Sequence, residues 1–392
     1  METLLRKMKP KVSFIVPCYK LGHLLSDCVE SILCQTYRDF EVLIMDDCSP
    51  DDTPEVARSF QDPRVTHIRN EPNLGHLPNY NKGIGLSRGK YIWLISADDQ
   101  LRTPYVLQRY VELMDRHPEV GFVFCPGVGI LDGKEIGLLG YSVHDSQDAI
   151  FEGHRFLLKL LERNTVLAAA GMVRRECYER VGVFPLDMPY GGDWFLWCAF
   201  ALHYDVGYFA EPMVNYRQHD LSMTNLLRSE DERILMKDDI TLPWRIKKEC
   251  EKAGYNALAS SCVEFIVRQY LRCFLGREWR NPATRLTPQE FDSSVESYTS
   301  NLRERNYIRA RVFSTVGDRC YGAADYERAL FYYRQTMSEG FFMPALWLKY
   351  GLLRMGPVGK YIRDGLSDVS SWRKGLPGKA GTNRPGGYGH SS

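Results

Sequence analysis

Short apolar runs alternate with stretches of helical periodicity in the first part of the chain. The apolar runs lie at 12–16, 40–45, 65–68, 91–95 and 120–125, and runs of this length between turn residues are typical of buried strands. Between them, apolar residues recur at helical spacing, with helices expected to begin near 24, 53 and 103. Strands that alternate with helices predict an α/β fold with a mainly parallel sheet covered on both faces.

Polar residues follow three of the predicted strands. The endings are Pro17-Cys18-Tyr19, Asp46-Asp47 and Asp98-Asp99. The carboxyl ends of parallel strands meet at one edge of a sheet, where ligands bind. We therefore expect these side chains to converge on one rim. The glycine-rich stretch 83–90 precedes a strand instead of following one, so it is expected to be a turn and not a nucleotide-binding loop.

The character of the sequence changes near residue 232. Apolar and charged residues at helical spacing run through 235–277 and 307–355, with little strand signal. The expected organisation is an α/β domain at 1–231, a helical domain at 232–374 and a disordered tail at 375–392, which is rich in Gly, Pro and Ser. Residues 324–333 resemble the second helix of a tetratricopeptide repeat, but one such unit does not make an array.

Charge and cysteine usage narrow the classes of function. Fifty basic residues balance forty-nine acidic ones, which excludes a nucleic-acid binder that relies on bulk positive charge. The 11 cysteines form no C-x-x-C pair, so a reduced, cytoplasmic protein without a structural zinc site is expected. No apolar run is long enough to span a membrane. Basic residues of the tail could contact an anionic membrane surface peripherally; these are Arg373, Lys374, Lys379 and Arg384.

Three acidic positions carry candidate chemistry. Two adjacent carboxylates at a strand end, Asp98 and Asp99, repel each other unless a cation or strong donors offset the charge. Mg²⁺ is commonly held by one or two carboxylates together with substrate phosphates. Asp193, in Gly191-Gly192-Asp193, could serve as a general base. The alternative is that these residues are turn residues or N-caps of the helices that follow.

Taken in order, the motifs resemble glycosyltransferase family 2, whose members have the GT-A fold of nucleotide-diphospho-sugar transferases. The matching segments cover roughly 10–225 and lie at 12–19, 31–37, 40–49, 73–75, 88–99, 191–193 and 215–219. On the donor side, the resemblance implies that Pro17 and Tyr19 line the base pocket and that Asp47 accepts from the nucleobase. Lys82 and Arg88 could contact phosphate.

The resemblance also implies the catalytic and metal-binding residues. Asp98 would approach the ribose or the sugar, and Asp99 would hold Mg²⁺ or Mn²⁺ on the diphosphate. Asp193 falls where inverting members carry the catalytic base. His219 would complete the diphosphate or metal site, or would instead cap a loop at the domain junction. One departure is Gly192, which stands where a glutamate frequently precedes the base.

The expected function is therefore an inverting, metal-dependent glycosyltransferase that moves a single sugar, since the Gln-x-x-Arg-Trp segment of processive synthases is absent. The donor would be a nucleotide-diphospho-sugar, with a UDP-sugar favoured, and the acceptor a hydroxyl of a glycan, a lipid-linked molecule or a protein. No nucleic acid is expected as a partner, and the helical region could form a homo-oligomer. Two alternatives stay open: a non-catalytic scaffold with a partner-binding helical region, and a nucleotidyltransferase.

Overall fold

The computed structural model describes residues 9–220, 222–275, 285–340 and 344–356, together with 358, 359 and 362. It divides into two compact units, Met1–Leu286 and Thr287–Ser392. The division falls later than the expected boundary between 231 and 232. The expected disordered tail at 375–392, with its basic residues, lies outside the described residues.

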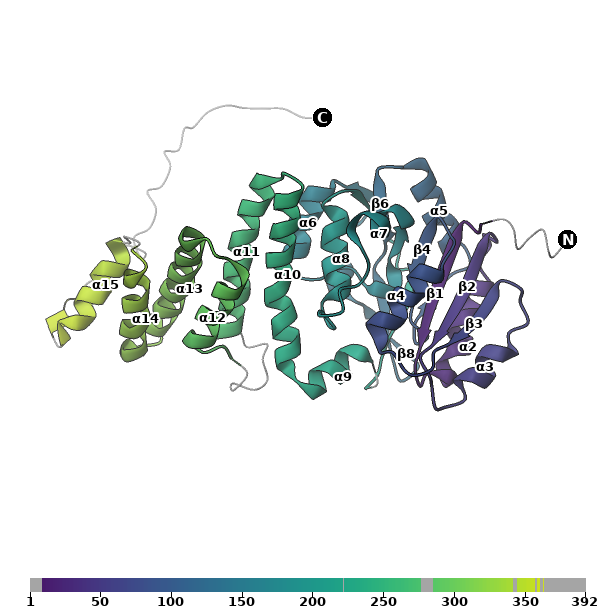
Figure 1. The fold of residues 1–392 in the computed structure, drawn as a ribbon, viewed down its shortest axis with the longest axis horizontal. Helices are drawn as coiled ribbons and strands as arrows, with labels where there is room; N and C mark the ends of the chain where they lie inside the picture. Colours follow the sequence, from purple (N-terminus) through teal and green to yellow (C-terminus); the bar gives the residue numbers. More distant parts are fainter. Residues whose placement is uncertain are drawn as a thin grey trace, which may run out of the picture. The chain divides into compact units, whose positions relative to one another are not determined.

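The first unit is built on an eight-stranded sheet with the order β3-β2-β1-β4-β10-β6-β11-β9 (Figure 1). Its strands are β1 (Val12–Cys18), β2 (Phe40–Asp46), β3 (Val65–Arg69), β4 (Tyr91–Leu94), β6 (Val120–Phe124), β9 (Ala149–Phe151), β10 (Met172–Arg174) and β11 (Asp205–Tyr208). β10 is antiparallel to β4 and β6, and β9 is antiparallel to β11, whereas the other pairs are parallel. The predicted mainly parallel sheet is confirmed.

A smaller four-stranded sheet has the order β5-β12-β7-β8, which the sequence analysis did not foresee. Its strands are β5 (Gln100–Leu101), β7 (Gly127–Leu131), β8 (Lys134–Leu138) and β12 (Val214–Gln218). β7 and β8 are joined by Asp132-Gly133, both with positive φ, as in a tight hairpin turn. Antiparallel pairing of β12 with β5 brings the end of β12 beside the Asp98-Asp99 segment.

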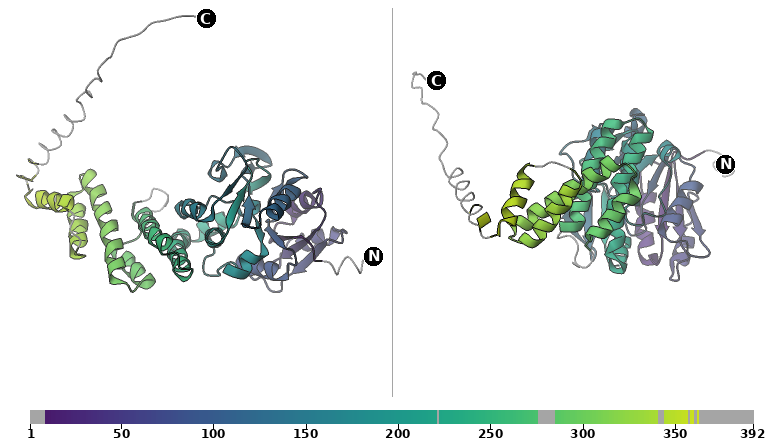
Figure 2. Two further views of the ribbon diagram at one scale, coloured as in Figure 1. Left: turned by 90° about the horizontal axis from the view of Figure 1, so that it is seen from above. Right: turned by 60° about the vertical axis from the view of Figure 1, so that its left-hand side comes forward.

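Alternate residues of the strands point to opposite faces of the main sheet. Phe14 and Val16 pack under α2 (Gly22–Leu33), α3 (Thr53–Ser59) and α5 (Val106–Arg116). Ile15 and Leu43 pack in the other cluster, with α4 (His76–Leu86), α6 (Gly153–Glu162) and α8 (Gly192–Ala201). The remaining short helices of this part are η1 (Gly140–Ser142), η2 (Ala168–Ala170) and α7 (Arg175–Val181). Figures 1 and 2 show the purple strands β1, β2 and β3 side by side.

The glycine-rich stretch 83–90 is only partly a turn, because α4 extends to Leu86. A Cβ at Gly83 would lie 2.6 Å from Ile15 Cγ2. This glycine lets the helix approach the sheet closely, which explains its presence inside a helix.

Three further helices complete the first unit: α9 (Met223–Glu230), α10 (Glu232–Lys252) and α11 (Asn256–Leu275). α10 packs against α8, and α11 packs against α6. Leu242 and Ile246 of α10 are fully buried in the same cluster as Trp194 of α8. The helical character that begins near residue 232 therefore does not mark the domain boundary, because these helices finish the core of the α/β unit.

The second unit contains α12 (Pro288–Tyr298), α13 (Leu302–Gly322), α14 (Tyr326–Ser338) and α15 (Pro344–Arg354). α13 and α14 form a helical hairpin whose turn contains Ala324 at a φ of 60°. Phe291, Phe313 and Tyr333 are buried in this unit. Across the described residues of the whole chain, no helix is both long and apolar enough to cross a membrane.

Candidate active site

The polar endings of β1, β2 and β4 meet at one edge of the sheet, as expected. The amide of Asp47 donates to the carbonyl of Cys18 at 2.9 Å, and the amide of Ala97 donates to the carbonyl of Pro17 at 3.1 Å. Tyr19, Asp47 and the Asp98-Asp99 pair therefore follow directly from neighbouring strands.

A pocket of about 650 Å³ opens beside this rim. It brings together Asp98, Asp99 and Asp193, although Asp193 is distant from the pair in sequence. Its aromatic lining comprises Tyr80, Tyr141, Phe184, Tyr190, Trp194 and Tyr216. Part of the wall comes from α9, α10 and α11 through Leu227, Leu235 and Arg272. An apolar and aromatic cavity with a few convergent carboxylates has the properties of a small-molecule site.

Asp98 and Asp99 have different environments. Asp98 Oδ2 shares a hydrogen bond with His219 Nε2 at 2.9 Å, and Asp99 Oδ1 accepts from the amide of Arg217 at 3.0 Å. Burial opposes the charge of Asp98, but hydrogen bonds from His219 and Ser96 and the charge of His219 leave its pKa lowered. Burial and then the charge of Asp98 raise the pKa of Asp99 well above its usual range.

The residues present fit a divalent cation that is shared with a ligand. Asp98 Oδ1 is buried and has no hydrogen-bond partner among the described residues, and the carboxylate of Asp99 is buried next to it in the chain. In the described part of the chain, no group of three or more His, Cys, Asp or Glu side chains is arranged to hold an ion. The cation would therefore need oxygen atoms from a phosphate ligand, as Mg²⁺ often does.

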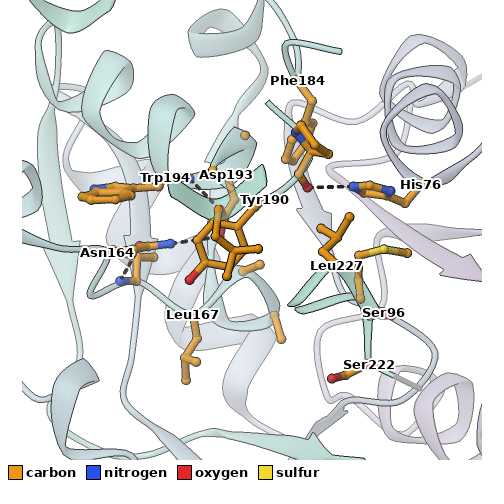
Figure 3. Close-up of a pocket in the computed structure, with 18 of the residues that line it drawn as sticks. His76, Ser96, Asn164, Leu167, Phe184, Tyr190, Asp193, Trp194, Ser222 and Leu227 are labelled. Atoms are coloured by element: carbon orange, nitrogen blue, oxygen red, sulfur yellow. Dashed lines mark hydrogen bonds between the residues drawn. The ribbon is translucent and has the colours of Figure 1, made fainter. Parts of the chain in front are cut away.

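Asp193 lies in the first turn of α8 and faces the same pocket. Its Oδ1 accepts from the amide of Trp194 at 2.6 Å, and its Oδ2 accepts from Asn164 Nδ2 at 3.1 Å (Figure 3). Burial raises the pKa of Asp193 to about 6, although both hydrogen bonds act to lower it. A carboxylate with a pKa near the operating pH is suited to accept a proton.

Four of the expected donor-side residues lie at the rim but do not line the pocket. Pro17 is buried in β1, and the exposed Tyr19 follows it. Both oxygens of Asp47 hold the following loop: Oδ1 accepts from the amide of Leu74 at 2.8 Å, and Oδ2 accepts from the amide of Gly75 at 2.9 Å. Lys82 Nζ donates to Asn70 Oδ1 at 2.6 Å.

Arg88 is not part of the site, and the expected phosphate contact is wrong. Its guanidinium Nη2 pairs with Glu41 Oε2 at 2.6 Å, and its amide donates to Glu41 Oε1 at 2.8 Å and to Ser13 Oγ at 3.1 Å. Ser13 and Glu41 lie at the amino ends of β1 and β2, opposite to the rim. The physical reason is positional: residue 88 precedes β4, so it must lie at the end of the sheet where that strand begins.

Three pocket residues were missed by the sequence analysis. Asn164 donates to the Asp193 carboxylate. His76 Nε2 shares a hydrogen bond of 2.8 Å with the carbonyl of Pro189, and Figure 3 shows its ring pointing toward that loop. Tyr190 lies in the same loop and lines the pocket. His76 and Tyr190 had a sequence signal, since His76 directly follows the Asn73-Leu74-Gly75 motif and Tyr190 directly precedes Gly191-Gly192-Asp193; Asn164 had none.

Sheet order, rim carboxylates and flanking helices together define the GT-A fold of nucleotide-diphospho-sugar transferases. The crystal structure of residues 1–349 of S. aureus TarS in complex with UDP-GlcNAc matches with a TM-score of 0.56 and 14% identity, covering 89% of this chain and 92% of that one. At this identity the likeness shows the fold. Residues 13–182 match the model of glycosyl transferase family 2.

Curated proteins that resemble this chain include glycosyltransferases. An uncharacterized glycosyltransferase of Rickettsia typhi is 26% identical over 216 residues, which are 55% of this chain and 66% of that protein. Glycosyltransferase GlyG of Streptococcus pneumoniae is 33% identical over 115 residues, covering 29% of this chain and 38% of GlyG. The chain thus spans 66% or less of the length of these relatives.

Proposed function

We propose that the protein is an inverting, metal-dependent glycosyltransferase that moves one sugar from a nucleotide-diphospho-sugar to a hydroxyl of an acceptor. The observation that carries this proposal is the meeting of Asp193, with a pKa of about 6, and the Asp98-Asp99 pair in one pocket. The match of residues 13–182 to the model of glycosyl transferase family 2 supports the reaction class.

Asp99, Asp98 and His219 are the residues that would hold Mg²⁺ or Mn²⁺ together with the donor diphosphate. The ion would neutralise the charge that develops on the departing nucleoside diphosphate. His219 already bonds Asp98 Oδ2, which leaves Oδ1 of the same carboxylate available to a ligand. Arg217 fixes Asp99 through its backbone amide and fixes the Asp98 carbonyl through Nε.

Asp193 would act as the general base. As the acceptor oxygen bonds to the anomeric carbon, its proton passes to the Asp193 carboxylate, and the bond from the anomeric carbon to the diphosphate oxygen breaks with its electron pair. Attack on the face opposite to the leaving group inverts the anomeric centre. Asn164 holds Asp193 Oδ2, which orients the carboxylate toward the pocket.

A UDP-sugar is the favoured donor. Its support is the TarS structure, which has the same fold and was determined with UDP-GlcNAc. Pro17, Tyr19, Asp47 and Lys82 are the proposed nucleotide-side residues, since they lie at the rim next to the pocket. The acceptor would be a glycan, a lipid-linked molecule or a protein.

The test combines binding with transfer. UDP, GDP, dTDP and CMP are screened by thermal shift with and without Mn²⁺, because a ligand of the native state raises its apparent stability. We expect UDP to give a metal-dependent shift that Asp193→Asn retains and Asp99→Ala weakens. The Asp193→Asn variant should show no sugar transfer. If no nucleotide shifts the wild-type protein, the scaffold alternative is favoured instead.

A further inference from the structure

The loop that precedes the proposed base, residues 187–191, is anchored by a helix outside the family-matched segment. Asp238 of α10 accepts from the amides of Tyr190 and Gly191, both at 2.8 Å and both through Oδ2. Arg245, also in α10, pairs with Asp187 of the same loop. Asp193 comes only two residues after Gly191 and lies in the first turn of α8.

Asp238 is buried, and burial of an ionised carboxylate is energetically unfavourable. It is 1% exposed and precedes Leu242 and Ile246 at four-residue steps, so it lies on the face of α10 that is buried against α8. Burial raises its pKa, and the two amide hydrogen bonds act in the opposite direction. Its Oδ1 has no hydrogen-bond partner among the described residues.

The two amides explain why a polar side chain is present there. Gly191 is the N-cap residue of α8, so Asp238 holds the backbone at the point where this helix begins. Without Asp238, the buried amide of Gly191 and the partly buried amide of Tyr190 would lose this acceptor, and a buried unsatisfied donor is unfavourable. A Cβ at Gly191 would lie 3.2 Å from Asp238 Cβ, so the backbone of Gly191 packs closely against the Asp238 side chain.

We infer that Asp238 is a positioning residue, which sets the place of Asp193 and Tyr190 in the pocket by holding the 190–191 backbone against α10. This inference rests on the proposed function, because it gives α10 a role in the base step. It also explains why the helices after residue 231 pack into the α/β unit: one of them fixes the start of the helix that carries the base.

The test compares Asp238→Ala and Asp238→Asn with Asp205→Ala as the matched control. Asp205 Oδ1 also anchors a helix start, by accepting from the amide of Gly153 at 2.9 Å, but Asp205 does not line the pocket. Amide hydrogen exchange of residues 188–195 is measured by mass spectrometry, and hydrolysis of UDP-GlcNAc, in which water replaces the acceptor, is measured across pH. The Asp193 carboxyl is titrated by carbon NMR.

We expect Asp238→Ala to speed exchange in 188–195 and to lower kcat about 10- to 100-fold, since small misplacements of a reacting group have effects of this size. Water reaching Asp193 should lower its pKa toward the ordinary value, so the acid limb of the rate moves to lower pH. Asp238→Asn keeps an acceptor oxygen and should restore exchange and kcat, and Asp205→Ala should change neither. If Asp238→Ala does not fold, Gly191→Ala strains the same contact and should give a smaller loss of kcat.

Unchanged exchange and an unchanged Asp193 titration in Asp238→Ala would overturn the inference, as would faster exchange with unchanged kcat. A wild-type protein that processes no nucleotide-sugar would refute the proposed function instead. In that case exchange and the NMR titration, which need no turnover, still decide whether Asp238 places Asp193.

Discussion

Replacing Asp193 by asparagine should abolish transfer and stabilise the fold at the same time. Burial raises the pKa of this carboxyl from 3.8 to about 6, and each unit corresponds to roughly 1.4 kcal/mol. Keeping the carboxylate ionised at neutral pH therefore costs the folded state about 3 kcal/mol. A neutral amide avoids this cost, but the Asn164 amide must then turn and give up its bond from the amide of Val166, a loss of about 1 kcal/mol. The net gain is about 2 kcal/mol.

The sign of the pH dependence makes this prediction specific. The folded state binds the Asp193 proton more tightly than the unfolded chain does. The free-energy cost of an ionised Asp193 in the folded state is therefore absent below about pH 4, grows as the pH rises toward 6 and is constant above that. Urea titrations of both proteins, followed by tryptophan fluorescence at about pH 7.5 and about pH 4.5, measure the difference in unfolding free energy. A gain of the same size at both pH values would refute the assignment of the cost to an ionised Asp193.

Three further predictions test two residues of the pocket and one residue at the opposite edge of the sheet. Asn164→Leu removes a donor that lowers the pKa of Asp193, so the acid limb of kcat should move to higher pH while UDP binding, followed by thermal shift, stays the same. Asp99→Ala should reduce the Mn²⁺-dependent part of the UDP shift, and an undiminished metal dependence would exclude Asp99 from the ion site. Arg88→Met leaves Glu41 without its ion pair, so we expect an unfolding free energy lower by up to about 1 kcal/mol with unaltered UDP binding; a weakened UDP shift would return Arg88 to the donor site.

The rim of the site could be predicted from the sequence because it depends on order along the chain. Strand runs ending at Pro17, Asp47 and Asp99 imply a common edge once the sheet is parallel. The same logic, applied to a residue that precedes a strand, would have excluded Arg88. Local patterns could not predict two long-range contacts, Asn164 with Asp193 and Asp238 with Gly191. Asn164 lies in the loop after α6 and Asp238 lies in α10, and neither segment carries a motif.

The carboxylates of the pocket are separated in function by their surroundings. His219 keeps the pKa of Asp98 low, burial beside Asp98 raises the pKa of Asp99, and burial, opposed by hydrogen bonds, brings the pKa of Asp193 to about 6. Groups whose pKa values are pushed apart in this way are suited to different tasks. Asp98 is then suited to stay ionised beside His219, and a cation that arrived with the donor would favour the ionised form of Asp99. The pKa of about 6 for Asp193 is raised by burial and not by a neighbouring ion, so we expect the base step to remain with Asp193 even if another ion or nucleotide proves to be the natural ligand.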